Sequence, residues 1–280
     1  MRCGVSIFLT DDSIGPADVA RAIEERGLDS IFVPEHTHIP TSRKTPWAGG
    51  PELPKHYIRT LDPFVALGVA AAVTSRITLA TGVTLVPERD PIVLAKEVAT
   101  LDHVSNGRVI LGVGAGWNRE EMENHGVEFG ARWKITRERV LAMKTIWREE
   151  AAEFHGEYVD FDPIWSWPKP VQAGGPPVWL GSKSRWVPDR VADYGDGWIP
   201  IHGRDGEAAI GQLREACARR GRDFDDITLG VFGCPPKEEE ARTLIAQGYR
   251  HLVFLLPSAG RDTVLPKLDR LAALAARLRD

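Results

Sequence analysis

Short apolar runs alternate with amphipathic helical patterns along nearly the whole chain. Alternating strands and helices predict a parallel sheet. Eight such units predict closure into a (β/α)8 TIM barrel, because the inward-facing side chains of eight strands just fill the interior of such a barrel. The predicted strands are Cys3–Leu9, Asp29–Pro34, Ile77–Leu85, Arg108–Gly114, Val178–Gly181, Gly197–Ile201, Ile227–Phe232 and His251–Leu256.

The clearest helical patterns lie in the first half of the chain, at Pro16–Arg26, Asp62–Thr74, Ile92–Val104 and Arg132–Glu150. Phe154–Phe161 alternates around a central glycine and predicts an extra hairpin outside the main sheet. Two long irregular stretches, 37–60 and 117–131, follow strands two and four. Loops of this length in a compact domain are usually functional or disordered, and here a functional role is favoured. No linker interrupts the pattern, so we expect one domain over residues 1–280.

Glycines mark the ends of two neighbouring strands. The third strand contains Gly82, followed by Val83 and Thr84, and the fourth ends in Gly112-Val113-Gly114-Ala115-Gly116. Bare backbone at the carboxyl ends of parallel strands provides a floor for a planar cofactor. The glycine spacing also resembles a dinucleotide fingerprint, but neither the third glycine nor the later acidic residue of that motif is found.

The segment Gly181-Ser182-Lys183-Ser184-Arg185 follows a predicted strand and opens a helix that runs to Tyr194. A helix N-terminus with hydroxyl donors and basic side chains suits a phosphate group. Late barrel strands are a frequent place for such sites. The alternative is an ordinary helix cap with a solvated basic turn.

His36 follows Glu35 at the exit of the second strand. A histidine at this end of a barrel can pass a proton to or from a substrate. Glu35 could orient it or pair with a core arginine, and the alternative role for His36 is to anchor the loop. Trp47 and Trp117 fall in loops or at strand ends, where they could form the walls of an apolar pocket. No histidine, cysteine or carboxylate spacing indicates a metal site.

Composition narrows the class of protein. The 280 residues are 43% hydrophobic with a net charge of -4, which argues against nucleic acid as the main partner. The longest apolar run, Phe64–Val73, is far short of the ~20 residues that a membrane span needs. The first apolar run meets Asp11 and Asp12, which is unlike a signal peptide. Three cysteines without paired spacing suggest reduced thiols, so we expect a cytoplasmic enzyme.

Several segments together resemble the bacterial-luciferase-like superfamily, and within it the small oxidoreductases that depend on the deazaflavin coenzyme F420. The resemblance covers most of the chain. It is carried by Val33–Pro40, Thr81–Asp102, Gly107–Trp117, His155–Glu157, Trp165–Pro170, Pro177–Gly181 and Gly195–Trp198.

The resemblance implies a barrel that holds a flavin-type ring. It implies a bulge with a non-prolyl cis peptide at Gly82–Val83 behind the ring, a phosphate loop at Ser182, Lys183 and Ser184, and His36 on the reaction face. Relatives that oxidise sugar phosphates carry a glutamate directly after the strand-four glycines. This chain has Trp117 there, which makes an apolar small-molecule substrate more plausible.

The resulting hypothesis is hydride transfer between coenzyme F420 and an organic substrate. One rival is an FMN-dependent monooxygenase that uses reduced flavin and O2, and another is a non-catalytic ligand-binding barrel. Related proteins are often dimers, so a homodimer is compatible with the resemblance. F420 has an anionic tail, so basic residues at the mouth of the barrel favour F420 over FMN. The basic residues expected there are Arg43, Lys44, Lys55, Arg59, Lys183 and Arg185.

Overall fold

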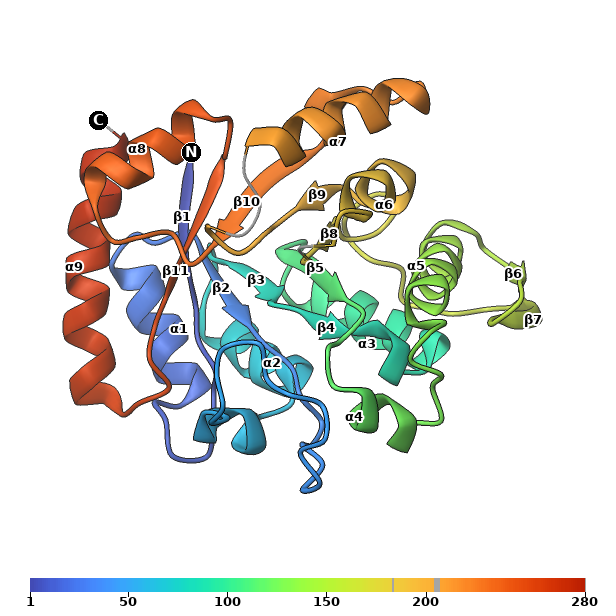
Figure 1. Cartoon of the computed structure of the whole chain (residues 1–280), viewed down its shortest axis with the longest axis horizontal. Helices are drawn as coiled ribbons and strands as arrows, with labels where there is room; N and C mark the ends of the chain where they lie inside the picture. Colours follow the sequence, from blue (N-terminus) through green and yellow to red (C-terminus); the bar gives the residue numbers. More distant parts are fainter. Residues whose placement is uncertain (183, 204–206, 280) are drawn as a thin grey trace.

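Eight parallel strands close into a barrel in the computed structural model, which describes residues 1–182, 184–203 and 207–279. Each strand pairs with its neighbours in parallel, and β1 against β11 and β3 against β5 complete the circle. The predicted (β/α)8 architecture is therefore confirmed (Figure 1). The barrel strands are β1 (Arg2–Ser6), β2 (Ser30–Val33), β3 (Thr78–Thr81), β5 (Val109–Gly114), β8 (Val178–Leu180), β9 (Gly197–Trp198), β10 (Thr228–Phe232) and β11 (His251–Leu255).

Helices surround the barrel (Figure 1). Helices α2 and α3 have the same N-terminal cap. Asp62 and Asp90 each accept hydrogen bonds from two backbone amides, and a proline follows at the first helical position. The four helical patterns named above agree with α1, α2, α3 and α5 to within two residues at each end. The main helices are α1 (Pro16–Glu25), α2 (Pro63–Val73), α3 (Pro91–Val104), α5 (Arg132–Arg148), α6 (Val187–Tyr194), α7 (Glu207–Arg219), α8 (Glu238–Ala246) and α9 (Arg261–Arg279).

The core has two main parts. A large apolar cluster packs the helices against the outside of the barrel, and a smaller one fills the barrel interior. In the interior, the rings of Phe32 and Phe232 meet edge to face, with their centroids 5.2 Å apart. The interior cluster consists of Phe32, Ala80, Ile110, Trp179, Ile199, Phe232 and Val253.

The third strand is interrupted at Gly82, where the resemblance implied a bulge. It divides into β3 and a short β4 (Thr84–Leu85), and the Gly82–Val83 peptide between them is cis, as the resemblance implied. A Cβ added at Gly112 on the adjacent β5 would lie only 2.1 Å from the Thr81 carbonyl oxygen. Glycine at 112 therefore allows the two strands to approach at the bend.

The loops differ in part from expectation. The stretch 117–131 is not wholly irregular, because it contains α4 (Arg119–Asn124), whose six residues are too few to show a periodic pattern. The stretch 37–60 is irregular up to the 3-10 helix η1 (Lys55–Arg59). Two more 3-10 turns are η2 (Val86–Glu88) and η3 (Phe224–Asp226).

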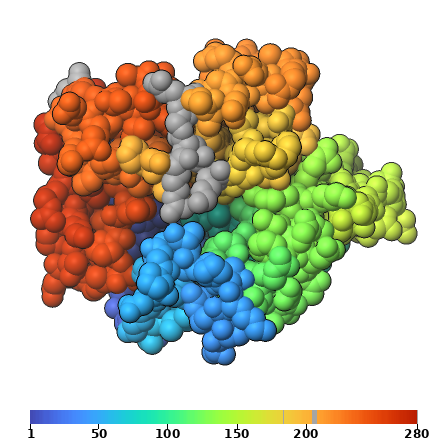
Figure 2. All heavy atoms as spheres, viewed as in Figure 1, coloured from blue at the N-terminus to red at the C-terminus, as the bar shows by residue number. Residues whose placement is uncertain are grey.

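The predicted hairpin is present as β6 (Ala152–His155) and β7 (Asp160–Ile164), and it protrudes from the barrel (Figure 2). The strand expected at Gly197–Ile201 is shorter, since β9 ends at Trp198 and only an isolated bridge joins Ile201 to Phe232. Among the described residues, none of the helices has the length and apolar character required to cross a membrane.

Candidate functional site

A pocket of about 350 Å³ opens at the carboxyl ends of the barrel strands. This is the end at which barrel enzymes place their chemistry, and the volume is in the range of small-molecule sites. Its wall is mostly apolar and aromatic. The lining residues are Phe8, Pro34, Glu35, His36, Tyr57, Gly82, Val83, Leu85, Gly114, Ala115, Gly116, Trp117, Trp133, Gly181, Ser182, Ile199, Ile201 and Phe232.

Val83 and the glycines around it form one side of the pocket. A Cβ added at either Gly114 or Gly181 would lie 2.7 Å from a methyl carbon of Val83, so side chains at these positions would collide with it. The ends of β5 and β8 thus present backbone beside Val83, which is the kind of surface that a flat ring can approach. Thr84 is fully buried and does not line the pocket.

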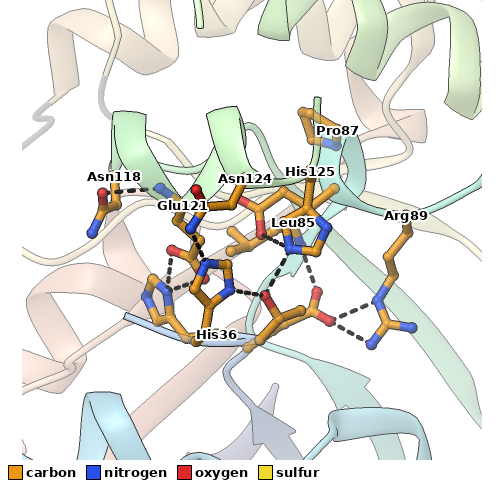
Figure 3. Close-up of polar contacts among 12 residues, drawn as sticks. His36, Leu85, Pro87, Arg89, Asn118, Glu121, Asn124 and His125 are labelled. Carbon is orange, nitrogen blue, oxygen red and sulfur yellow. Dashed lines mark hydrogen bonds and ion pairs between the residues drawn. The ribbon is translucent and has the colours of Figure 1, made fainter. Parts of the chain in front are cut away.

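His36 lies in the pocket wall with both ring nitrogens in contact with other side chains. Nδ1 is 2.8 Å from an oxygen of Glu121 (Figure 3). Trp117 Nε1–H donates to Nε2 over 3.3 Å. A carboxylate accepts from Nδ1–H, which leaves Nε2 as the acceptor in the neutral ring. His36 therefore has Nδ1 held by Glu121, while the lone pair of Nε2 accepts from Trp117.

Glu121 was missed by the sequence analysis. It lies on α4, where Asn118 caps the helix by accepting from the backbone amide of Glu121. Its side chain is only 1% exposed. The contact with His36 joins residues 85 positions apart, so no local spacing could have indicated it.

Glu35 pairs with a core arginine rather than with His36. One carboxyl oxygen accepts from Arg89 Nε at 2.6 Å, and the other accepts from the Leu85 amide at 2.7 Å. Burial raises the pKa of Glu35, while the positive charge of Arg89 acts in the opposite direction. The pair fastens β4, and with it one edge of the pocket, to the exit of β2.

A second polar layer lies behind His36 (Figure 3). Thr37 contacts His38 and His125, each at 2.9 Å, and Asn124 contacts His38 at the same distance. These contacts tie the loop after β2 to the end of α4. Figure 2 shows the two segments packed together, in blue and green respectively.

The predicted phosphate loop is only partly described. Ser182 lines the pocket, Ser184 is half-buried, Arg185 is exposed and lies over the Trp186 ring, and Lys183 lies outside the described residues. Helix α6 begins later than expected, at Val187. The phosphate role of this segment stays a prediction.

The two tryptophans predicted for the substrate pocket have different positions. Trp117 is in the lining, whereas Trp47 is not, and its Nε1–H instead donates to the hydroxyl of the lining residue Tyr57 over 3.2 Å. Trp133 lines the pocket from α5 and was not singled out from the sequence. Its position in a long helix gave no sign that it faces the barrel mouth.

Two of the basic residues predicted for the mouth of the barrel form ion pairs with acidic side chains. Lys55 forms an ion pair with Asp12 at 2.5 Å, and Arg59 pairs with Asp11. These two side chains therefore give weaker support to an anionic tail than the sequence suggested. Within residues 1–182, 184–203 and 207–279, no group of three or more His, Cys, Asp and Glu side chains is placed to hold a metal ion.

Comparison with known proteins agrees with this architecture. The family model described as luciferase-like monooxygenase matches residues 16–276. The chain belongs to this family. Members of the luciferase-like family are oxidoreductases and monooxygenases, and an uncharacterized protein of Mycobacterium tuberculosis is 42% identical over 99% of both chains.

Relatives in the luciferase-like family differ in cofactor. The F420-dependent glucose-6-phosphate dehydrogenase of Kineococcus radiotolerans is 32% identical over 75% of this chain and 60% of its own. The FMNH(2)-dependent dimethylsulfone monooxygenase of Pseudomonas fluorescens is 29% identical over 56% of this chain and 44% of its own.

A solved F420-dependent secondary alcohol dehydrogenase covers all of both chains with a TM-score of 0.77 at 19% identity, which supports the fold.

Proposed function

We propose that this protein is an oxidoreductase that transfers a hydride between coenzyme F420 and an apolar organic substrate. The observation that carries the proposal is one pocket that combines bare backbone around Gly82 and Val83 with His36 in its wall. A planar redox ring fits the backbone surface, and a proton-transferring group within the same pocket fits a reaction that moves a hydride and a proton together.

The residues present fit such a cofactor. The added-Cβ collisions at Gly114 and Gly181 show that only glycine leaves room for Val83 at these positions, so the strand ends border the pocket with backbone. Ser182, Lys183, Ser184 and Arg185 would hold the phosphate of its arm at the approach to α6. When bound, the deazaflavin ring supplies a carbon that accepts or donates the hydride.

The protein's own residues would position the substrate and manage its proton. Aromatic side chains, Phe8, Tyr57, Trp117 and Trp133, give the pocket an apolar wall that excludes water. Nε2 of His36 would take a proton from a substrate hydroxyl, or return it, while Glu121 holds Nδ1. When the substrate binds, its hydroxyl would replace the Trp117 N–H as the hydrogen-bond donor to Nε2 of His36.

A fluorescence titration with each purified cofactor tests the proposal. We expect F420 to bind at least about tenfold more tightly than FMN, a difference of about 1.4 kcal/mol. Tight binding of FMN alone would contradict the assignment and favour a reduced-flavin monooxygenase, as in the Pseudomonas relative. Binding of neither cofactor would favour a non-catalytic barrel.

The matched variant for this test is His36→Asn. It removes the proton-transferring ring while leaving the backbone surface unchanged, so F420 should still bind. Loss of F420 binding in this variant would show that His36 holds the cofactor rather than handling the proton.

A further inference from the structure

Glu88 is a buried acid next to the pocket that no step above uses. It ends η2, and its side chain is 1% exposed. Neither of its carboxyl oxygens has a hydrogen-bond partner within the described part of the chain. A Cβ added at Gly116 would lie 3.6 Å from one of these oxygens, so the carboxyl group lies against the backbone of a pocket-lining residue. A charged carboxylate in such a place would lack solvation.

The charged groups around Glu88 come from four segments. Glu35 at the exit of β2 is paired with Arg89, and Glu121 of α4 is paired with His36. The Nε2 atom of His125, just after α4, is 3.8 Å from a Glu88 oxygen. Arg139 of α5 donates to the carbonyls of Val86 and Pro87 within η2.

Burial and the negative charges of Glu121 and Glu35 raise the pKa of Glu88 to about 9, with Arg89 opposing them. Glu88 is therefore a neutral acid near pH 7. The two carboxylates that act on Glu88, Glu35 and Glu121, each have a positively charged or proton-bearing partner, and Glu121 is the one that faces His36.

We propose that Glu88 is a positioning residue for proton transfer at His36. By staying protonated, it leaves Glu121 as the group that carries the negative charge next to the His36 ring. The inference rests on the proposed function, which gives His36 its role. When Glu88 ionises, its O–H bond breaks, the electron pair stays on the carboxylate and the proton is released to water. The added negative charge then repels that of Glu121 and disturbs the charge balance between Glu121 and the His36 ring.

The first test is the pH dependence of stability for the wild type and Glu88→Gln, measured by denaturant unfolding without cofactor. The folded wild type keeps a proton that the unfolded chain releases above the ordinary carboxyl pKa of 4.5. The contribution of Glu88 to stability therefore falls as the pH rises from there to about 9, by up to about tenfold in the unfolding constant per pH unit. Gln cannot ionise, so the free energy of unfolding of the variant should increase relative to that of the wild type as the pH rises through this window.

The matched control is Glu123→Gln on the same helix as Glu121, because its side chain is 54% exposed. Its stability difference from the wild type should stay constant across that window. A constant difference for Glu88→Gln as well would overturn the proposal.

A measurement on the wild type covers the case in which the variant does not fold. Infrared spectroscopy should detect the carbonyl band of a protonated carboxylic acid at pH 7 and its loss as the pH passes about 9. A Glu88 that is ionised at pH 7 would give no band that disappears near pH 9, and the inference would then be wrong.

The link to His36 is tested separately by ring ¹⁵N resonances in histidine-labelled protein. In the wild type, the His36 and His125 signals should shift together as Glu88 ionises, and in Glu88→Gln this step should disappear. If Glu88 ionises without moving the His36 signals, it has no positioning role. None of these measurements uses F420, so their failure is distinct from a failure to bind the cofactor.

Discussion

Replacing Arg89 with methionine should strongly destabilise the protein, because it leaves Glu35 buried without its charged partner. Glu35 is 3% exposed, and Arg89 contacts it through a 2.6 Å hydrogen bond. Removing one member of a buried ion pair costs about 3–5 kcal/mol. The further contacts of Arg89 with Asp62 and Glu97 involve more exposed partners, and each adds at most about 1 kcal/mol.

Urea unfolding at several pH values is the assay. In Arg89→Met, Glu35 should take up a proton on folding, so this variant loses stability as the pH rises above the ordinary carboxyl pKa of 4.5. The free energy of unfolding that Arg89→Met loses relative to the wild type should therefore be larger at pH 8 than at pH 5. The double variant Glu35→Gln/Arg89→Met should recover most of the loss, since no buried charge then remains unpaired.

Arg277→Met is the matched control, because Arg277 is 56% exposed and pairs with Glu238 at the surface. It should cost less than about 1 kcal/mol. If Arg89→Met also loses less than about 1 kcal/mol, and the loss does not depend on pH, the argument that Glu35 and Arg89 fasten β4 to the exit of β2 is refuted.

Three further outcomes are expected. Gly114→Ala should lower F420 affinity by at least about tenfold in the fluorescence titration, because its Cβ would lie 2.7 Å from Val83, whereas Gly15→Ala, where nothing lies within 4 Å, should have no effect. Burial raises the pKa of the Cys234 thiol to about 12, so at pH 8 it should react with a thiol reagent only when urea unfolds the chain. Leu111→Ala, at a fully buried position, should cost about 2–5 kcal/mol in urea unfolding.

The fold was largely predictable because its signals are local. Apolar runs of four to nine residues marked the strands, and helical patterns marked α1, α2, α3 and α5 to within two residues at each end. The interruption of the third strand came instead from the resemblance, which implied a cis peptide at Gly82–Val83, and the structure has that cis peptide. Helix α4 was missed because six residues give less than two turns of pattern.

The polar partners of the site were harder to predict, since they depend on contacts between distant segments. His36 was singled out from its position after a strand, but Glu121 reaches it from a helix 85 residues later. Glu88 gave no signal, because an acidic residue in Pro87-Glu88-Arg89 looks like any surface turn. Only the closing of the barrel shows that this carboxyl group lies next to Gly116.

The hydrogen bond from Trp117 to His36 has an evolutionary consequence. Trp117 both limits the room in the pocket and touches the residue proposed to move the proton. A substitution there that admitted a bulkier substrate would also alter the chemistry of His36. Divergence toward new substrates should therefore proceed first through Ile199 or Ile201, which border the cavity without contacting the imidazole through a hydrogen bond.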